Sequence, residues 1–384
     1  MPAEKFIPFA RPTISRAAIN EVVACLESGW LTTGPRAAKF EAMMRDYFTA
    51  PHALACLNAT MGLWMVLKGI GLKPGDEVIT SPLTFVATLN TIVLAGGTPV
   101  LVDVEPGTYN LDVKKLAAAI TKKTRALMPV HFAGCPCDLD KIYALAKKHR
   151  LRVIEDCAHA IGTGYKGRRL GSFGDVQVFS YHPNKNLTTG EGGAVVTRDD
   201  QLAHSITIQR FHGIDKSAWW RHSKIPGLGH YDVVEAGLKS NFMDIQAALG
   251  IHQLAALEGF NQKRRALAEY YFKKLRGLPG LTLPTPPAYA NPHSWHLFAP
   301  VVEPGAKVDR DTLMVELKKR NIGTGLHYTA CHLHSFYEKK FGFRRGDFPQ
   351  AERISDGVLS LPLYPTLTRR DQDRVIRALG EILG

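Results

Sequence analysis

The chain has 384 residues, of which 45% are apolar and 22% charged, and it carries a formal net charge of +13 at neutral pH. This length is too great for one small domain, and the balance is that of a globular protein with a sizeable core. Because no apolar run reaches ~18 residues and the start lacks the apolar stretch of a signal peptide, we expect a cytoplasmic protein with no membrane span.

The positive charge favours polyanionic partners, but the sequence has neither a basic run nor a nucleic-acid-binding module. We therefore expect dispersed surface cations, no nucleic-acid partner and at most a basic pocket for a diphosphate. The six cysteines are scattered, which predicts free thiols and no disulfide framework. Cys135 and Cys137 lie near His131, where a metal site is conceivable; small residues in a loop explain the pair better, so we expect no metal.

Residues from about 53 to 200 alternate strand-like and helix-like segments. Strands separated by helices of this length predict an α/β fold with a mostly parallel central sheet between helices. The expected strands cover residues 77–81, 99–104, 126–131, 151–156, 176–181 and 194–197. The expected helices between them cover residues 60–71, 85–95, 112–120 and 139–149.

The rest of the chain reads as a long helix over residues 243–275 and a Pro-rich linker over 278–292. A strand over 294–302 and helices over 309–320 and 369–383 are expected to follow. These elements predict a large α/β domain over residues 1–255 and a small α+β domain over residues 256–384.

Lys185 follows a predicted strand and precedes small, hydroxyl and glycine residues. An amine held at such a sheet edge can lose water, have its pKa lowered and form a Schiff base. Asp156 ends another apolar strand, where its carboxylate can pair with a protonated pyridine nitrogen or cap the next helix. The two interpretations of Asp156 are equally good until Lys185 is considered, which favours the cofactor. His159, one turn beyond Asp156, can bond the hydroxyl of the same ring.

The run from Asn58 to Thr60 opens an apolar helix, whose first N–H groups form an anion site; an ordinary helix cap is the commoner explanation. Ser180 can add a hydroxyl to the same phosphate, and Phe85 can stack on a pyridine ring, although each residue alone is ordinary. The sequence has no G-x-G-x-x-G fingerprint and no P-loop, so a nicotinamide or ATP site has little support.

Four runs, at residues 75–80, 84–88, 155–156 and 180–193, together resemble the DegT/StrS family of nucleotide-sugar aminotransferases. The resemblance extends from about residue 26 to residue 365. It implies a pyridoxal 5'-phosphate (PLP) enzyme of fold type I, with a large PLP-binding domain that includes an N-terminal substrate-entrance segment.

The resemblance also implies roles for single residues. Lys185 is the expected Schiff-base lysine and Asp156 the expected partner of the pyridinium nitrogen, which makes both catalytic. Asn241 is expected to reach the cofactor of the partner subunit, which implies a homodimer with shared active sites. The remaining expected cofactor contacts are His159, Ala59, Thr60, Phe85 and Ser180.

The expected reaction moves an amino group from glutamate to the keto carbon, C4 in particular, of a nucleotide-linked keto sugar. Such products serve cell-surface polysaccharide, lipopolysaccharide or related amino-sugar biosynthesis. The runs 293–298 and 323–328 are most similar to those of enzymes that aminate a UDP-4-keto-pentose, of the 4-amino-4-deoxy-L-arabinose type. The expected substrate contacts are Trp30, Thr33, His182, His327 and Tyr328.

Two alternatives share this fold. A sensor would bind the cofactor without turnover, and would not need Lys185, Asp156 and His159 together. A sugar dehydratase of the family carries His at the Schiff-base position, so Lys185 disfavours it.

Overall fold

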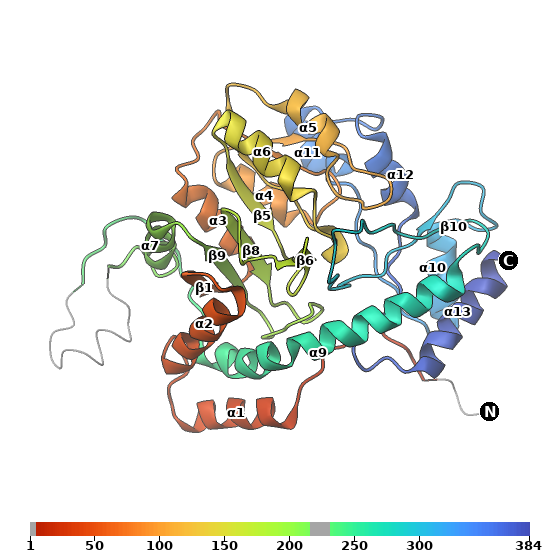
Figure 1. Cartoon of the computed structure of the whole chain (residues 1–384), viewed down its shortest axis with the longest axis horizontal. Coiled ribbons are helices and arrows are strands. Elements are labelled where there is room, and N and C mark those ends of the chain that lie inside the picture. The colour runs from red at the N-terminus through yellow and green to blue at the C-terminus, as the bar shows by residue number, and fades with distance from the viewer. Residues whose placement is uncertain (1–4, 216–230) are drawn as a thin grey trace.

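A seven-stranded sheet forms the centre of the molecule (Figure 1), with strand order β1-β9-β8-β5-β4-β2-β3. The computed structural model describes residues 5–215 and 231–384. All neighbouring strands are parallel except β9, which is antiparallel to both β1 and β8. The expected mostly parallel α/β sheet is thus confirmed. The strands are β1 (His52–Cys56), β2 (Glu77–Thr80), β3 (Thr98–Leu101), β4 (Thr124–Leu127), β5 (Arg152–Asp156), β8 (Val176–Ser180) and β9 (Gly193–Thr197).

Helices cover both faces of this sheet. Successive side chains of a strand point to opposite faces, and apolar strand side chains are buried on each face. In β8, Val178 packs with the helices of one face and Phe179 with those of the other. One face is covered by α3 (Ala59–Gly69), α4 (Ala87–Leu94) and α7 (Asp200–Gln209). The other is covered by α2 (Pro35–Phe48), α5 (Val113–Ala119), α6 (Leu139–His149) and the first half of α9 (Asp244–Leu275).

The second half of α9 packs into a separate apolar cluster built mainly by the C-terminal part of the chain. Leu267 and Tyr271 of α9 meet Leu313 and Leu379 in that cluster. The elements of this part are β10 (Leu281–Thr282), β11 (Val301–Val302), α10 (Arg310–Lys319), α11 (Ser335–Phe341), α12 (Pro349–Gly357) and α13 (Arg369–Leu383). The other elements of the described residues are helix α1 (Arg16–Glu27), the small hairpin of β6 (Gly164–Tyr165) and β7 (Arg168–Arg169), and the short 3-10 helices η1 (Phe132–Gly134) and η2 (Cys331–Leu333).

Helices α6 and α13 have the bounds expected from the sequence, 139–149 and 369–383. The strand expected over 294–302 is wrong for most of its length, because only Val301–Val302 pair as a strand. The peptide groups before them bond elsewhere: the His296 N–H donates to the Ala133 carbonyl, and the Ser294 carbonyl accepts from the Asn186 side chain. The Pro-rich segment contains the short strand β10, which pairs with β11.

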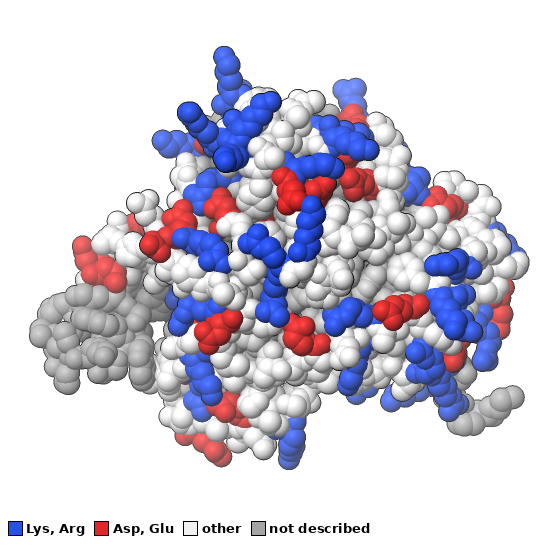
Figure 2. Space-filling model, in the orientation of Figure 1, with Lys and Arg blue, Asp and Glu red and all other residues white. Residues whose placement is uncertain are grey.

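Surface charge is mixed on the face shown in Figure 2, where Lys and Arg side chains alternate with acidic ones over most of the outline. A denser basic group lies at the upper left of this view, around the upper end of α6. Across the described parts of the chain, no helix is both long enough and apolar enough to span a bilayer.

Candidate active site

A cavity of about 540 Å³ lies at the carboxyl ends of β5 and β8, between the start of α3 and the loop at residues 326–328. Parallel sheets bind their ligands at this edge. The structure brings ten of the expected site residues together in its wall: Ala59, Thr60, Phe85, Asp156, His159, Ser180, His182, Lys185, His327 and Tyr328.

Lys185 lies in the loop between β8 and β9. The base of this loop is closed where the Tyr181 N–H donates to the Gly192 carbonyl at 2.8 Å. Beside the lysine, the amide of Asn186 donates to Asn261 of α9 at 2.7 Å and to the Ser294 carbonyl at 2.8 Å. Because the protein surrounds the amine, loss of water lowers the pKa of Lys185 to about 8, against a smaller opposing effect of Asp156.

Asp156 ends β5 and is 6% exposed. The Thr88 hydroxyl donates to one carboxylate oxygen at 2.8 Å, and the Ala158 N–H donates to the other at 3.1 Å. Burial raises the pKa of Asp156, while these donors and the charge of Lys185 oppose that rise. The carboxylate is therefore held rigidly and faces the same cavity as the lysine.

The start of α3 forms a cradle for an anion. The Asn58 side chain accepts the Met61 N–H at 2.9 Å, which leaves the first-turn N–H groups of Ala59 and Thr60 for a ligand. Gly193 makes this close packing possible, since a Cβ there would lie 2.6 Å from the Ala59 nitrogen. Ser180 ends the adjacent strand in the same wall. Together with Asp156 and Lys185, this cradle fits a phosphorylated pyridine aldehyde.

Another part of the cavity wall is formed by side chains with rings. Phe85 is 56% exposed, and its ring lies 5.8 Å from that of Tyr328. His159 bonds both the Ala133 N–H, at 3.2 Å, and the Tyr328 hydroxyl, at 2.9 Å. Burial lowers the pKa of His159 well below its usual value and that of His327 to about 4. Both imidazoles are therefore neutral at pH 7.

Trp30, Thr33 and Asn241 form a separate group. The Asn241 amide donates to the Thr33 hydroxyl at 2.7 Å, and the Trp30 indole N–H donates to the Thr33 carbonyl at 3.2 Å. Among the described residues of this single chain, these three do not line the cavity. Their expected roles, including the contact of Asn241 with a partner's cofactor, stay predictions.

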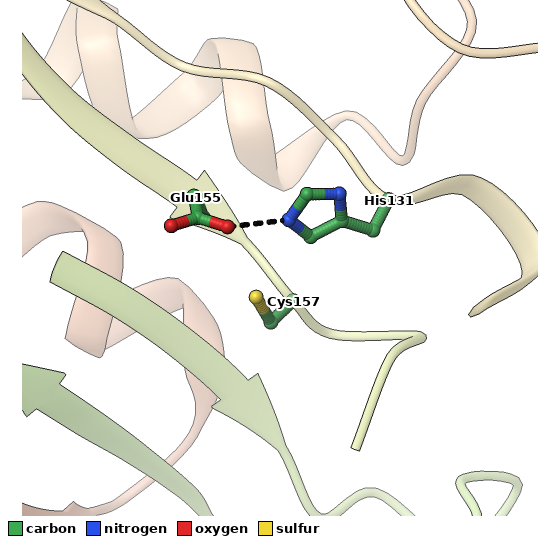
Figure 3. A group of neighbouring side chains, drawn as sticks. All are labelled: His131, Glu155 and Cys157. Atoms are coloured by element: carbon green, nitrogen blue, oxygen red, sulfur yellow. Dashed lines mark hydrogen bonds and ion pairs between the residues drawn. The ribbon is translucent and has the colours of Figure 1, made fainter. Parts of the chain in front are cut away.

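His131, Glu155 and Cys157 form a second buried cluster on β5 and the segment beside it (Figure 3). The Cys137 N–H donates to His131 Nδ1 at 3.1 Å, so the neutral ring carries its proton on Nε2 and donates it to Glu155 at 2.9 Å. Tyr143 and Gln177 donate to the other Glu155 oxygen. Because these bonds occupy both imidazole nitrogens, we interpret the cluster as a support for the end of β5.

Sequence reasoning missed Thr88 and Asn186. The signal for Thr88 was its spacing, since Thr84 and Thr88 stand four residues apart at a helix start and their hydroxyls lie 2.8 Å apart. Asn186 had no comparable signal, because its partners Asn261 and Ser294 are 75 and 108 residues away in the chain.

The chain is similar to known proteins over nearly its whole length. The model of the DegT/DnrJ/EryC1/StrS aminotransferase family matches residues 12–380. The spore coat polysaccharide biosynthesis protein SpsC of Bacillus subtilis is 44% identical over 380 residues, which is 98% of this chain and 97% of SpsC.

Two solved structures have the same architecture. DesV from S. venezuelae is 35% identical with a TM-score of 0.88, and the match covers 98% of both chains. Spr1654 from Streptococcus pneumoniae, assigned as a sugar aminotransferase, is 32% identical in its PMP-form with a TM-score of 0.91 and 98% of both chains covered. A PLP-form of Spr1654 has also been solved.

Proposed function

Because this chain belongs to the DegT/DnrJ/EryC1/StrS aminotransferase family, we propose that it transfers the amino group of glutamate to C4 of a nucleotide-linked keto sugar. The chain is a PLP-dependent sugar aminotransferase of fold type I. One observation carries the chemical part of the proposal: the Lys185 amine, with its pKa lowered to about 8, shares a cavity with the buried carboxylate of Asp156.

Each residue has a role that its surroundings allow. PLP supplies an aldehyde that links to amines and a ring that accepts an electron pair. Lys185 would hold the aldehyde carbon of bound PLP and, as a neutral amine, would accept the proton of the donor's α-carbon. Asp156 would keep the pyridine nitrogen protonated, the start of α3 and Ser180 would hold the phosphate, and Phe85 would pack on the ring face.

The group formed by Trp30, Thr33 and Asn241 supports the proposal of a homodimer. These residues do not line the cavity of their own chain, and we infer from this that Asn241 reaches the phosphate bound by a second copy. We place the substrate entrance at the contact between the two copies. In this proposal, His182 and His327 of the cavity wall contact the sugar or its diphosphate.

The name of SpsC supports a role in cell-surface polysaccharide synthesis, with lipopolysaccharide or a related amino-sugar product as the other outcome. We place this protein in the cytoplasm. The proposal of a UDP-4-keto-pentose substrate rests on the runs 293–298 and 323–328.

The first experiment compares wild type with Lys185→Ala, using exposed Lys263→Ala as the matched control. We expect wild type and Lys263→Ala to show the visible absorbance of lysine-linked PLP and to lose it on addition of glutamate. Lys185→Ala should show neither the band nor turnover. Retained turnover in Lys185→Ala would refute the assignment, and a wild-type band that glutamate does not bleach would favour the sensor.

The second experiment incubates the glutamate-treated protein with UDP-, dTDP- and GDP-linked 4-keto sugars. Return of the visible band identifies a substrate, and the structure of the amino-sugar product identifies the aminated carbon. Absence of reaction with every 4-keto sugar would contradict the C4 proposal.

A further inference from the structure

The hydrogen bonds around His159 have a fixed direction. The Ala133 N–H lies 3.2 Å from His159 Nδ1, and a backbone N–H can only donate. Nδ1 is therefore the unprotonated nitrogen. Since burial, with the nearby Lys185 charge, lowers the pKa of His159 well below its usual value, the neutral ring carries its only proton on Nε2.

This tautomer decides how Tyr328 is used. His159 Nε2 lies 2.9 Å from the Tyr328 hydroxyl oxygen, so the imidazole donates and the hydroxyl oxygen accepts. The hydroxyl hydrogen then remains available. Burial raises the pKa of Tyr328, which keeps that hydrogen in place. His159 is the only hydrogen-bond partner of this hydroxyl among the residues that the structure describes.

Three anchors orient a PLP ring in the cavity. Asp156 would take the pyridine nitrogen, Lys185 the aldehyde carbon, and the α3 cradle the phosphate. On the ring, the phenolic oxygen lies on the edge between the nitrogen end and the aldehyde carbon, opposite the phosphate arm. His159 follows Asp156 by three residues, and the charge of Asp156 adds to the effect of burial in raising the pKa of Tyr328.

We propose that Tyr328, oriented by His159, donates a hydrogen bond to the phenolic oxygen of the bound cofactor. His159 was expected to bond this oxygen itself, and Tyr328 to contact the substrate. Both His159 nitrogens already have partners within the chain, so His159 is the positioning residue and Tyr328 the contact. This inference rests on the proposed function, because it requires lysine-linked PLP in the cavity.

The bond has a measurable consequence. A donor to the phenolic oxygen stabilises its negative charge and so weakens the attraction of that charge for the proton on the linked Lys185 nitrogen. Tyr328→Phe removes the donor and keeps the ring. We therefore expect the pKa of the lysine-linked chromophore to rise by about one unit or more in Tyr328→Phe.

The test is a pH titration of the visible spectrum of the PLP-loaded protein, which reads the cofactor directly without turnover. Tyr337→Phe is the matched control, because its hydroxyl bonds Asn90 at 2.7 Å outside the cavity wall; its titration should match wild type. His159→Gln is the second variant, and should shift the titration in the same direction by a smaller amount, because Tyr328 loses its orientation. Bound PLP per chain and the unfolding midpoint show that each variant is folded.

A cofactor analogue that lacks the phenolic oxygen completes the design: wild type and Tyr328→Phe loaded with it should titrate alike. An unshifted Tyr328→Phe, with His159→Gln strongly shifted, would identify His159 as the donor and overturn the inference alone. A wild-type protein with no lysine-linked band would instead overturn the proposed function.

Discussion

At Lys185 and Asp156 burial acts on a cation and an anion in opposite directions. Loss of water lowers the pKa of the amine and raises that of the carboxyl, and each charge offsets part of the effect on the other. The pKa values of both groups are thereby brought closer to neutral pH, where proton transfer is most efficient. The Thr88 hydroxyl and the Ala158 N–H donate hydrogen bonds to the Asp156 carboxylate and hold it in place.

The rate at which the cofactor-free protein binds PLP covalently should follow the titration of the Lys185 amine. Only the neutral amine attacks an aldehyde, so the initial rate should rise with pH and level off near a midpoint of about 8. An ordinary lysine would give a midpoint of about 10.4. Stopped-flow absorbance at limiting PLP measures the rate, and a midpoint above about 10 would contradict the lowered pKa.

Asp156→Asn should reduce kcat by roughly 100-fold or more, because a neutral amide cannot hold the pyridine nitrogen protonated. Thr88→Val is the comparison, since it removes one donor to Asp156 and keeps the charge. We expect a smaller loss in Thr88→Val, of about 10-fold, in steady-state assays with glutamate. Equal losses in the two variants would show that position, and not charge, is what Asp156 supplies.

At the scale of elements, the site depends on how closely β9 approaches α3. Gly193 begins β9, and a Cβ there would lie 2.6 Å from the Ala59 nitrogen and 2.8 Å from the Phe179 carbonyl. Both atoms are backbone, so neither can move aside cheaply. The absence of a side chain at residue 193 therefore shapes the anion cradle.

Gly193→Ala should displace the start of α3, weaken PLP binding at least about 10-fold and destabilise the fold by about 1–3 kcal/mol. Gly259→Ala is the matched control: it lies on exposed α9 surface with no atom within 4 Å of the added Cβ, and should stabilise the helix by up to about 1 kcal/mol. PLP titration and urea unfolding measure the two effects. Unchanged PLP affinity in Gly193→Ala would refute the role of this packing.

At the scale of the whole molecule, α9 joins the two apolar cores. Its 32 residues give a rod of about 48 Å, with Leu257 in the sheet core and Leu267 in the C-terminal core. Arg264 lies buried between them and donates to the carbonyls of His296, at 3.2 Å, and Leu363, at 2.9 Å. The expected boundary after residue 255 falls inside this helix and stays a proposal; shared packing along α9 should make both parts unfold together.

Arg264→Leu should lower the free energy of unfolding by at least about 2 kcal/mol, because buried carbonyls lose their donor. Lys263→Leu, on the exposed side of the same turn, should change it by less than about 0.5 kcal/mol. Urea unfolding followed by far- and near-ultraviolet circular dichroism measures both variants. Two separated transitions in wild type would contradict the single cooperative unit.

Local sequence was enough to predict the sheet and most of its helices, because hydrophobic periodicity is a property of neighbouring residues. It also predicted Lys185, Asp156 and the start of α3, since each stands at the end or beginning of such an element. The expected strand is wrong over residues 294–300. An extended, apolar sequence pattern does not reveal whether its peptide groups pair with another strand or bond a side chain such as that of Asn186.

Only the tertiary structure decided what depends on distant contacts and on hydrogen-bond direction. The anchoring of the Lys185 loop to α9 joins residues 75 positions apart, and periodicity carries no information over that distance. The proton position on His159 depends on the Ala133 N–H, 26 residues away. The sequence by itself therefore determined the fold class, the family and its cofactor, because the runs of residues that carry them are local. The tertiary structure decided which groups are held, buried and free to donate.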